Sequence, residues 1–355
     1  MKQQTLCATI NRPTTFIDQP DSKFIQNGVH EGSSRPYELS RHPANPIICP
    51  SDFPSAIAVF NPGQTLYQGK VLLLLPVQHN SGSYRGKDAA FTGHVATSVD
   101  GVHFDINPEP LFEPSSVPPY SIVTEQCIDY RITQLEGAYY IIHPGCGPWG
   151  TMGILSRTTD FKTRENLGII SLPDNRMPCL FPEKIKGRYL RLDRPYRVCP
   201  NDYHEMGNLW VSSSPDLLHW GDHRPLLKPG FAHWAVSKIG PTPPIKTDEG
   251  WLVIIHGVSR SCAGHRYSIG AMLLDLDDPT KIIGLAKSAI LSPSEPYEFN
   301  GIVPNVVFPA GAVVLPEKDE IRVYYGCADT CVGLASGSLS GLIALCLSNS
   351  CGAAK

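Results

Sequence analysis

Charged and polar side chains stand beside apolar, strand-like runs at several points of the chain, where folding has to bury them. Burying a charge without a partner is costly, so such residues either pair with one another or bind a ligand. The set is Asn61, Asp129, Arg131, Arg176, Glu183, Asp193, Arg194, Lys238, His256 and Asp329. It combines several carboxylates with several cations.

This combination has a chemical interpretation. Carboxylates near aromatic residues are what a sugar-cleaving site needs, and guanidinium groups bind phosphate or carboxylate oxygens two at a time. A site that contains both indicates that phosphate attacks a glycosidic bond. The alternative is structural, with these ions paired to one another between neighbouring elements, and the spacing of the residues fits that arrangement too.

A repeat indicates which elements position these residues. A short polar turn followed by a β-rich run occurs five times, at intervals of about 50 to 70 residues. The turns are Gln68-Gly69, Glu136-Gly137, Lys186-Gly187, Glu249-Gly250 and Asp319-Glu320, the last without glycine. A second kind of turn falls between them, at Asp100, Asp160 and Asp216, as at the outer edge of a sheet.

The repeat predicts an all-β fold, a five-bladed β-propeller built from five four-stranded sheets. The 31 glycines and 33 prolines fit the many tight turns of such a fold. A β-sandwich is the alternative, but five similar units argue against it. In a propeller the inner strands converge on a central channel, so polar residues at their ends would meet in one site.

The chain ends differ from the repeats. Residues 1–40 match no repeat and contain Pro13, Pro20 and Pro36, so we expect an extended N-terminal arm followed by the propeller over residues 41–355. The apolar segment Leu334 to Leu347 contains Gly and Ser, and fits a closing strand plus turn as well as a helix.

Composition restricts the partners. A net charge of -3 argues against a nucleic-acid-binding surface. The chain has no apolar run of about 18 residues, and its N-terminus lacks the apolar core of a signal peptide. The eleven cysteines lack Cys-x-x-Cys spacing, which is typical of reduced thiols. We therefore expect a cytoplasmic protein with no nucleic-acid, membrane or metal partner.

Several long segments resemble glycoside hydrolase family 130, the five-bladed propellers that phosphorolyse β-mannosides. The resemblance covers roughly residues 41 to 345 and is closest to the mannooligosaccharide phosphorylase branch. The segments include Arg41-His42-Pro43-Ala44-Asn45-Pro46-Ile47, Leu180-Phe181-Pro182-Glu183-Lys184-Ile185, Lys238-Ile239-Gly240, Pro304-Asn305-Val306-Val307-Phe308-Pro309 and Tyr324-Tyr325-Gly326-Cys327-Ala328-Asp329-Thr330.

The resemblance implies a role for each matching residue. Asp129 matches the general acid, which protonates the leaving oxygen through the 3-hydroxyl of the mannosyl unit. The positions implied to hold phosphate are Arg176, Arg194, Lys238 and His256, and those implied to bind the mannosyl unit are Asn61, Arg131 and Asp329. The implied reaction is inverting phosphorolysis of a β-1,4-mannooligosaccharide-like substrate to α-mannose 1-phosphate, with inorganic phosphate as co-substrate and no cofactor.

One acid and a cationic clamp form a complete set for this reaction. An inverting hydrolase needs a second carboxylate to deprotonate water. Phosphate is already an anion, so it needs positioning and partial charge neutralisation but no base. Two alternatives stay open, namely a β-mannosidase of the same fold with Glu183 as a candidate base, and a non-catalytic glycan-binding propeller.

The chain departs from the family pattern near the implied site. Ile128 and Tyr130 flank Asp129 where the family has Glu and Pro, and Pro76 and Met177 replace an Arg and a polar residue. Asp193 replaces a His beside Arg194, and its negative charge would weaken the anion clamp. These changes leave the acceptor sugar and the linkage open, and the oligomeric state, a homo-oligomer included, is equally open.

Overall fold

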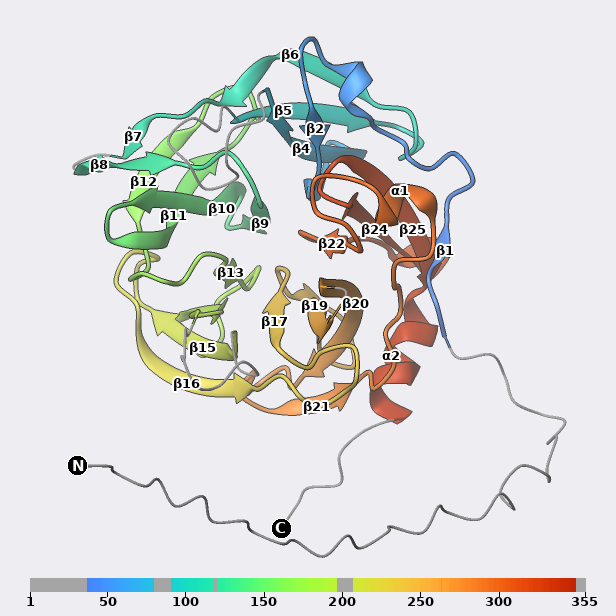
Figure 1. Cartoon of the computed structure of the whole chain (residues 1–355). Coiled ribbons are helices and arrows are strands. Elements are labelled where there is room, and N and C mark those ends of the chain that lie inside the picture. The colour runs from blue at the N-terminus through green and yellow to red at the C-terminus, as the bar shows by residue number, and fades with distance from the viewer. Residues whose placement is uncertain (1–36, 80–90, 118–119, 197–206, 263, 349–355) are drawn as a thin grey trace, which may run out of the picture. The chain divides into compact units, whose positions relative to one another are not determined.

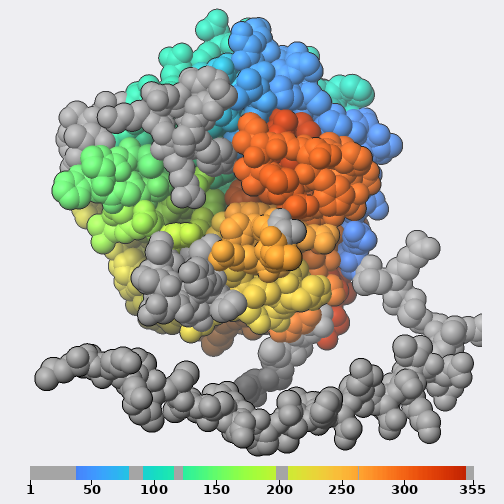
Figure 2. Space-filling model, in the orientation of Figure 1, coloured from blue at the N-terminus to red at the C-terminus, as the bar shows by residue number. Residues whose placement is uncertain are grey.

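The computed structural model describes residues 37–79, 91–117, 120–196, 207–262 and 264–348 (Figure 1). The predicted N-terminal arm lies outside the described residues as far as position 36. Residues 37–348, as described, form five antiparallel sheets that follow one another around a common centre in chain order (Figures 1 and 2). This arrangement is the predicted five-bladed β-propeller.

The bounds of the strands, sheet by sheet, are as follows. The first sheet contains β2 (Ala58–Val59), β3 (Gly63–Tyr67), β4 (Lys70–Gln78), β5 (Phe91–Ser98) and β6 (Asp105–Phe112). The second contains β7 (Ser116–Val117), β8 (Tyr120–Glu125), β9 (Arg131–Leu135), β10 (Ala138–Gly147), β11 (Gly150–Thr158) and β12 (Glu165–Ile169). The third contains β13 (Cys179–Leu180), β14 (Tyr189–Asp193), β15 (Leu209–Ser214) and β16 (Gly221–Leu227). The fourth contains β17 (Lys238–Pro241), β18 (Ile245–Lys246), β19 (Trp251–Ser261), β20 (Gly264–Leu274) and β21 (Ile282–Leu285). The fifth contains β1 (Ser40–Arg41), β22 (Val307–Pro309), β23 (Val313–Leu315), β24 (Glu320–Cys327) and β25 (Cys331–Ser338).

The innermost strand of most sheets is split in two, so these sheets contain more than the four strands predicted. Both β2 and β3 pair with β4, and both β8 and β9 pair with β10. Asn61 and Asp129 lie in these breaks with positive φ angles of 47° and 53°. Asn and Asp tolerate this left-handed backbone better than other non-glycine residues. The breaks therefore fall where the sequence permits them.

The repeated turns are the hairpins between the innermost strand and the next one. Gln68 and Gly69 both have positive φ, 50° and 76°, and Glu136 and Gly137 have 50° and 78°. Two consecutive positive φ angles define a tight type I′ turn, whose twist matches that of the flanking strands. The repeat predicted from the sequence is thus confirmed as the recurrent hairpin of the propeller.

The second kind of turn joins the third strand of a sheet to its outermost strand, as predicted. In one such turn, the Asp100 carboxylate accepts hydrogen bonds from the backbone N–H groups of Val102 and His103, at 2.8 and 2.9 Å. Asp160 accepts from Lys162 and Thr163 in the same way. Such local carboxylate bonds favour turns over regular structure.

The last sheet is completed by the N-terminal segment of the described chain. β1 pairs with β25 through Ser40–Ser336 and Arg41–Ala335. After β25 the chain forms the helix α2 (Leu339–Ser348), so the segment Leu334 to Leu347, for which a strand plus turn and a helix fitted equally well, is a strand as far as Ser338 and a helix after it. Ile343 of α2 packs in the same apolar core as residues of the fourth and fifth sheets.

The described helices are short, and none of them has the length and apolar character needed to cross a membrane. The other α-helix is α1 (Pro296–Phe299), and single 3-10 turns span Pro50–Asp52 and Pro316–Lys318. The cysteines of the described ranges are free thiols.

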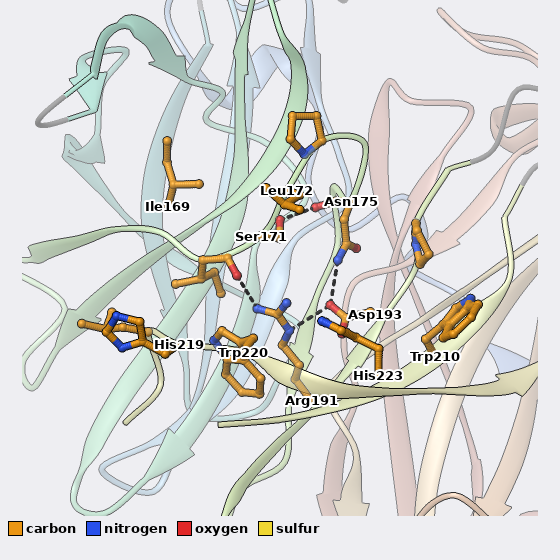
Figure 3. A pocket seen from close by; sticks show the side chains of 14 residues that line it. Ile169, Ser171, Leu172, Asn175, Arg191, Asp193, Trp210, His219, Trp220 and His223 are labelled. Carbon is orange, nitrogen blue, oxygen red and sulfur yellow. Dashed lines mark hydrogen bonds and ion pairs between the residues drawn. The ribbon is translucent and has the colours of Figure 1, made fainter. Parts of the chain in front are cut away.

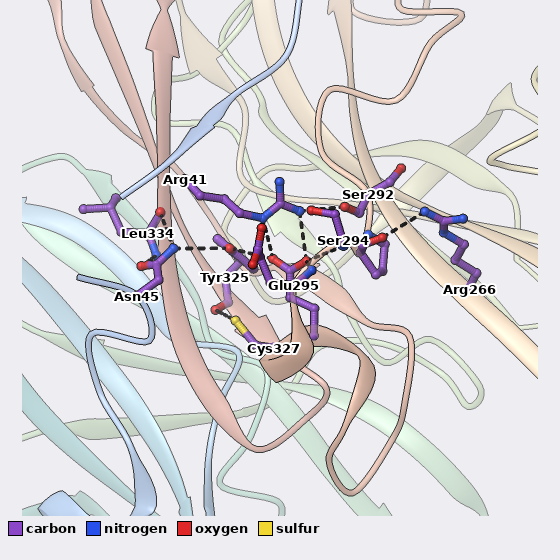
Figure 4. Close-up of polar contacts among 11 residues, drawn as sticks. Arg41, Asn45, Arg266, Ser292, Ser294, Glu295, Tyr325, Cys327 and Leu334 are labelled. Atoms are coloured by element: carbon purple, nitrogen blue, oxygen red, sulfur yellow. Dashed lines mark hydrogen bonds and ion pairs between the residues drawn. The ribbon is translucent and has the colours of Figure 1, made fainter. Parts of the chain in front are cut away.

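A buried ion pair connects α1 to β1 (Figure 4). Glu298 is fully buried and accepts hydrogen bonds from Nε and Nη2 of Arg41, at 2.8 and 2.9 Å. The Tyr325 hydroxyl and the backbone N–H groups of Ser294 and Glu295 also donate to this carboxylate. The ion pair thus connects β1, α1 and β24 just before the segment 303–306 that reaches the centre of the propeller.

Loss of this ion pair should destabilise the propeller strongly. We expect Arg41→Ala to lower the free energy of unfolding by about 3 kcal/mol, because it leaves Glu298 buried without its cation. Lys246→Ala is the matched control, since it breaks the pair Lys246–Glu183, whose side chains are about half exposed, and such pairs contribute under about 1 kcal/mol. Urea denaturation of both variants measures the difference, and equal losses would contradict a stabilising role for the buried pair.

Candidate active site

Seven of the eight residues assigned to the site line one cavity of about 280 Å³. They are Asn61, Asp129, Arg176, Arg194, Lys238, His256 and Asp329. Each of the five sheets, or the segment leading into it, supplies at least one of them. The cavity therefore lies where the sheets converge, as the propeller predicts.

The side chains reach the cavity from the ends and breaks of inner strands. Asn61 and Asp129 occupy the left-handed breaks described above. Arg176 precedes β13, Arg194 directly follows β14, and Lys238 begins β17. At these strand ends the backbone pairing of the sheet stops, and the side chains line the cavity at the centre of the propeller.

Two further residues come from the second strand of a sheet and from a turn. His256 lies in β19, where it pairs with Gly240 of β17. Asp329 lies in the turn between β24 and β25, where Ala328 and Asp329 both have a φ of 48°. The tight turn presents the Asp329 carboxylate to the cavity.

Asp129 is buried, and its carboxylate is held from both sides. Asn61 Nδ2 donates to Oδ1 at 3.0 Å, and Arg176 Nη2 donates to Oδ2 at 2.5 Å. Burial alone would raise the pKa of Asp129, but Arg176, Arg131 and the Asn61 hydrogen bond outweigh it and keep the pKa below its usual value. The carboxyl group is therefore ionised at neutral pH in the ligand-free site.

The cavity carries an excess of positive charge. Arg176, Arg194 and Lys238 line it together with only two carboxylates, Asp129 and Asp329. Burial, reinforced by Arg176, lowers the pKa of Arg194 to about 10, so this guanidinium stays charged at neutral pH. Arg194 is buried and the other two cations are partly buried, and an excess of cations in such a site is costly unless an anion compensates it.

Arg131 is the assigned residue that does not line the cavity. It is buried beside the cavity, where Nη1 donates to the backbone oxygen of Asp129 at 3.2 Å and Nη2 donates to Met177 Sδ at 3.1 Å. Its guanidinium adds a further positive charge close to Asp129. This placement fits a residue that positions Asp129 better than one that touches a sugar.

Four more cavity residues were not assigned to the site from the sequence, namely Tyr267, Val303, Val306 and Phe308. Lys238 Nζ donates to the Tyr267 hydroxyl at 2.7 Å, and burial raises the pKa of Tyr267 to about 12, so its hydroxyl stays protonated. The tyrosine therefore orients the lysine. Met177, noted above as a departure, also lines the cavity.

Asp193 does not weaken the cation cluster, contrary to the sequence-based expectation. Its carboxylate accepts from Arg191 Nε at 2.8 Å and from Asn175 Nδ2 at 2.7 Å. Arg194 lines the cavity and Asp193 does not, as expected for successive residues at the end of a strand, which point to opposite faces. Glu183, the candidate hydrolytic base, is also outside the cavity and pairs with Lys246 at 2.7 Å.

A second cavity, of about 600 Å³, lies between the second and third sheets (Figure 3). Its lining is largely apolar and aromatic, with Leu172, Trp210 and Trp220. Its charged residues Arg191 and Asp193 satisfy each other, and the Arg191 guanidinium lies 4.2 Å from the centre of the Trp220 ring. The cavity where the sheets converge, with its excess of charge, is therefore the candidate active site.

Known proteins share both the sequence and this fold. The family model described as β-1,4-mannooligosaccharide phosphorylase matches residues 40–347. The chain is 36% identical to the β-1,4-mannooligosaccharide phosphorylase of Ruminococcus albus over 299 residues, which is 83% of this chain and 87% of that protein. It is 33% identical to the β-1,2-mannobiose phosphorylase of Listeria innocua, over 82% of this chain and 94% of that one.

The fold comparison agrees with the sequence comparison. The structure of the Listeria innocua β-1,2-mannobiose phosphorylase, in complex with β-1,2-mannobiose, superposes with a TM-score of 0.74 at 30% identity. The superposition covers 87% of this chain and 99% of that one. These matches and the five-bladed propeller show that the chain is an enzyme that belongs to glycoside hydrolase family 130, whose characterised relatives named above are β-mannoside phosphorylases.

Proposed function

We propose that this enzyme cleaves β-mannosides by inverting phosphorolysis and releases α-mannose 1-phosphate. Phosphate binds to Arg176, Arg194 and Lys238, and Asp129 is the general acid. Asn61 and Asp329 bind the mannosyl unit. The observation that carries the proposal is the excess of cations, one buried and two partly buried, in a cavity that also contains Asp129, because an anionic nucleophile compensates that charge and water does not.

The reaction follows from this assignment. A phosphate oxygen attacks the anomeric carbon from the face opposite the leaving sugar, and the glycosidic C–O bond breaks. The leaving oxygen takes the proton of Asp129, relayed through the 3-hydroxyl of the mannosyl unit. Attack from the opposite face converts a β-mannoside into an α-phosphate.

We further propose a β-1,4-linked mannooligosaccharide as the substrate. The description of the matching family model and the Ruminococcus albus relative support this linkage. The Listeria innocua relative acts on a β-1,2 linkage, so the two linkages have to be compared directly.

Product analysis tests the reaction and the linkage together. We expect β-1,4-mannooligosaccharides to yield α-mannose 1-phosphate only when inorganic phosphate is present. Release of free mannose without phosphate would instead identify a β-mannosidase. Sugar binding by calorimetry without turnover of either linkage would identify a non-catalytic glycan-binding protein.

Asp129 has to gain a proton before it can act as an acid. In the ligand-free site Arg176 keeps it ionised. When phosphate binds, its oxygens compete with Asp129 for the Arg176 guanidinium, and their negative charge further disfavours a carboxylate. Bound phosphate therefore raises the pKa of Asp129, so that its carboxyl group can hold the proton that the leaving oxygen needs.

Phosphate binding should accordingly be coupled to proton uptake by Asp129. Because Asp129 gains a proton in the complex, the phosphate affinity of wild type relative to that of Asp129→Asn should increase as the pH falls through the neutral range. Calorimetry in buffers of different ionisation enthalpy measures the uptake. We expect wild type to take up more protons, by up to about one, than Asp129→Asn, in which any change in the protonation of phosphate itself is retained. Equal uptake in the two proteins would contradict the coupling.

A further inference from the structure

Three cysteines lie next to one another where the last sheet meets the chain that enters the first sheet. Cys49 precedes the strands of the first sheet, Cys327 ends β24 and Cys331 begins β25. Cys327 and Cys331 belong to the apolar core of the fourth and fifth sheets, and Cys49 packs against it. All three are free thiols, and none of them has a part in the proposed reaction.

The backbone hydrogen bonds of the neighbouring residues place Cys49 opposite Cys331. Val332 N–H donates to the Ile48 oxygen at 2.9 Å, and Ile48 N–H donates to the Val332 oxygen at 3.5 Å, so these two residues form a hydrogen-bonded antiparallel pair. Cys49 continues with an extended backbone, φ -124° and ψ 163°. Cys49 and Cys331 are therefore the next pair, of the non-hydrogen-bonded kind, with Cα atoms about 4.5 Å apart and side chains on the same face.

This pairing suits a disulfide, which joins cysteines whose Cα atoms are about 4.4 to 6.8 Å apart. Cys327 also lies opposite Cys331 in the sheet. That pair is of the hydrogen-bonded kind, because Val332, the next residue, makes its backbone bonds to Ile48. Side chains are farther apart in hydrogen-bonded pairs than in the others. Cys49 is therefore the better placed partner of Cys331.

The three thiols differ in exposure and acidity. Cys49 is partly exposed, whereas Cys331 is 6% exposed and Cys327 is fully buried, with its thiol 3.8 Å from the backbone oxygen of Tyr325 (Figure 4). The Cys327 thiol lowers the pKa of Cys331, while burial and the proximity of Cys331 raise the pKa of Cys49. Thiolates are the nucleophiles of thiol oxidation. Cys331 is thus the thiol that reacts first, and Cys49 lies beside it.

We propose that Cys49 and Cys331 form a reversible disulfide under oxidation, which closes the ring of the propeller with a covalent bond. Backbone hydrogen bonds already join Ile48 to β25 at this junction. The disulfide adds a link between the chain before the first sheet and the last sheet, so that the ring cannot open there. This inference does not depend on the proposed function.

Hydrogen peroxide supplies the oxidising equivalents. The Cys331 thiolate attacks one peroxide oxygen, the O–O bond breaks, and the hydroxide that leaves takes the thiol proton and becomes water. The Cys49 thiolate then attacks the sulfur of the Cys331 sulfenic acid, the S–O bond breaks, and a second water forms. Two thiols and one peroxide thus yield one disulfide and two waters. A thiol reductant such as dithiothreitol reverses the link by disulfide exchange.

Peptide mapping of the full-length protein tests the link. After treatment with hydrogen peroxide, alkylation of the remaining thiols and proteolysis, mass spectrometry should find the peptides of Cys49 and Cys331 joined, and dithiothreitol should separate them. Because the disulfide encloses most of the propeller, it restricts the unfolded chain strongly. The midpoint of thermal unfolding should therefore rise by roughly 5 to 10 °C on oxidation and return on reduction.

Two variants make the result specific. Cys262→Ser removes an exposed thiol that follows β19 and should give the same link and the same thermal shift as wild type. Cys49→Ser should lose both, and Cys49→Ala repeats the comparison if the serine variant is not folded. A link between Cys327 and Cys331, no link to Cys49, or an equal thermal shift in Cys49→Ser would overturn the proposal. None of these measurements uses turnover, so each outcome is independent of phosphorolysis.

Discussion

Asp129→Asn should lower kcat by roughly 10²- to 10⁴-fold, the usual contribution of a general acid. Asparagine has the same shape and still accepts a hydrogen bond from Asn61, but it has no proton to donate to the leaving oxygen. The fold should be retained, because the Arg176 guanidinium that loses its partner is partly exposed to solvent and asparagine suits the left-handed strand break at this position. Initial rates with β-1,4-mannooligosaccharide and phosphate measure the effect.

Two comparisons make this result specific. Asp216→Asn alters a carboxylate in an outer turn, where an amide oxygen still accepts the backbone N–H bonds of Leu218 and His219, so its kcat should equal that of wild type. Phosphate binding by Asp129→Asn should persist, since Arg176 no longer has a competing carboxylate. Wild-type turnover in Asp129→Asn would remove this residue as the acid.

The second large effect is expected from Arg194→Ala. The KM for phosphate should rise roughly 30- to 3,000-fold, because truncating a buried charged partner costs about 2–5 kcal/mol. The KM for the mannoside should change far less, since the cations hold the anion and not the sugar. Steady-state kinetics with each substrate varied in turn separate the two constants.

An arginine of the same sheet provides the control. Arg188 is exposed and donates to Ser213 Oγ at 2.9 Å, outside the cavity, so Arg188→Ala should leave both KM values unchanged. Equal increases in the two KM values of Arg194→Ala would argue against a phosphate clamp. They would indicate that the substitution distorts the whole cavity.

The features that could be predicted from the sequence are those that local chemistry determines. Gln68-Gly69 and its counterparts predict hairpins, because a glycine that follows a polar residue suits the positive φ angles of a tight turn. Five such hairpins suffice to predict a propeller. Family resemblance then singled out eight residues, of which the fold brings seven into one cavity.

The features that could not be predicted depend on tertiary pairing. Tyr267 reaches the cavity because β20 pairs with β19 in the register Val258–Tyr267. The residues next to Tyr267 in the sequence do not predict that register. The orientation of Asp193 depends on where β14 ends. Arg131 lies two residues after Asp129, but the left-handed backbone at Asp129 interrupts the alternation of the strand, so the two side chains take different places.

The pairing of β1 with β25 affects how the protein is made. Chains emerge from the ribosome N-terminus first, so Ser40 and Arg41 are translated before the other strands, yet their partners at positions 335 and 336 are translated only after the first four sheets. Glu298, which neutralises Arg41, also emerges late. A nascent chain can complete its first four sheets in order, but the fifth sheet, which needs both β1 and β25, forms only after β25 has emerged.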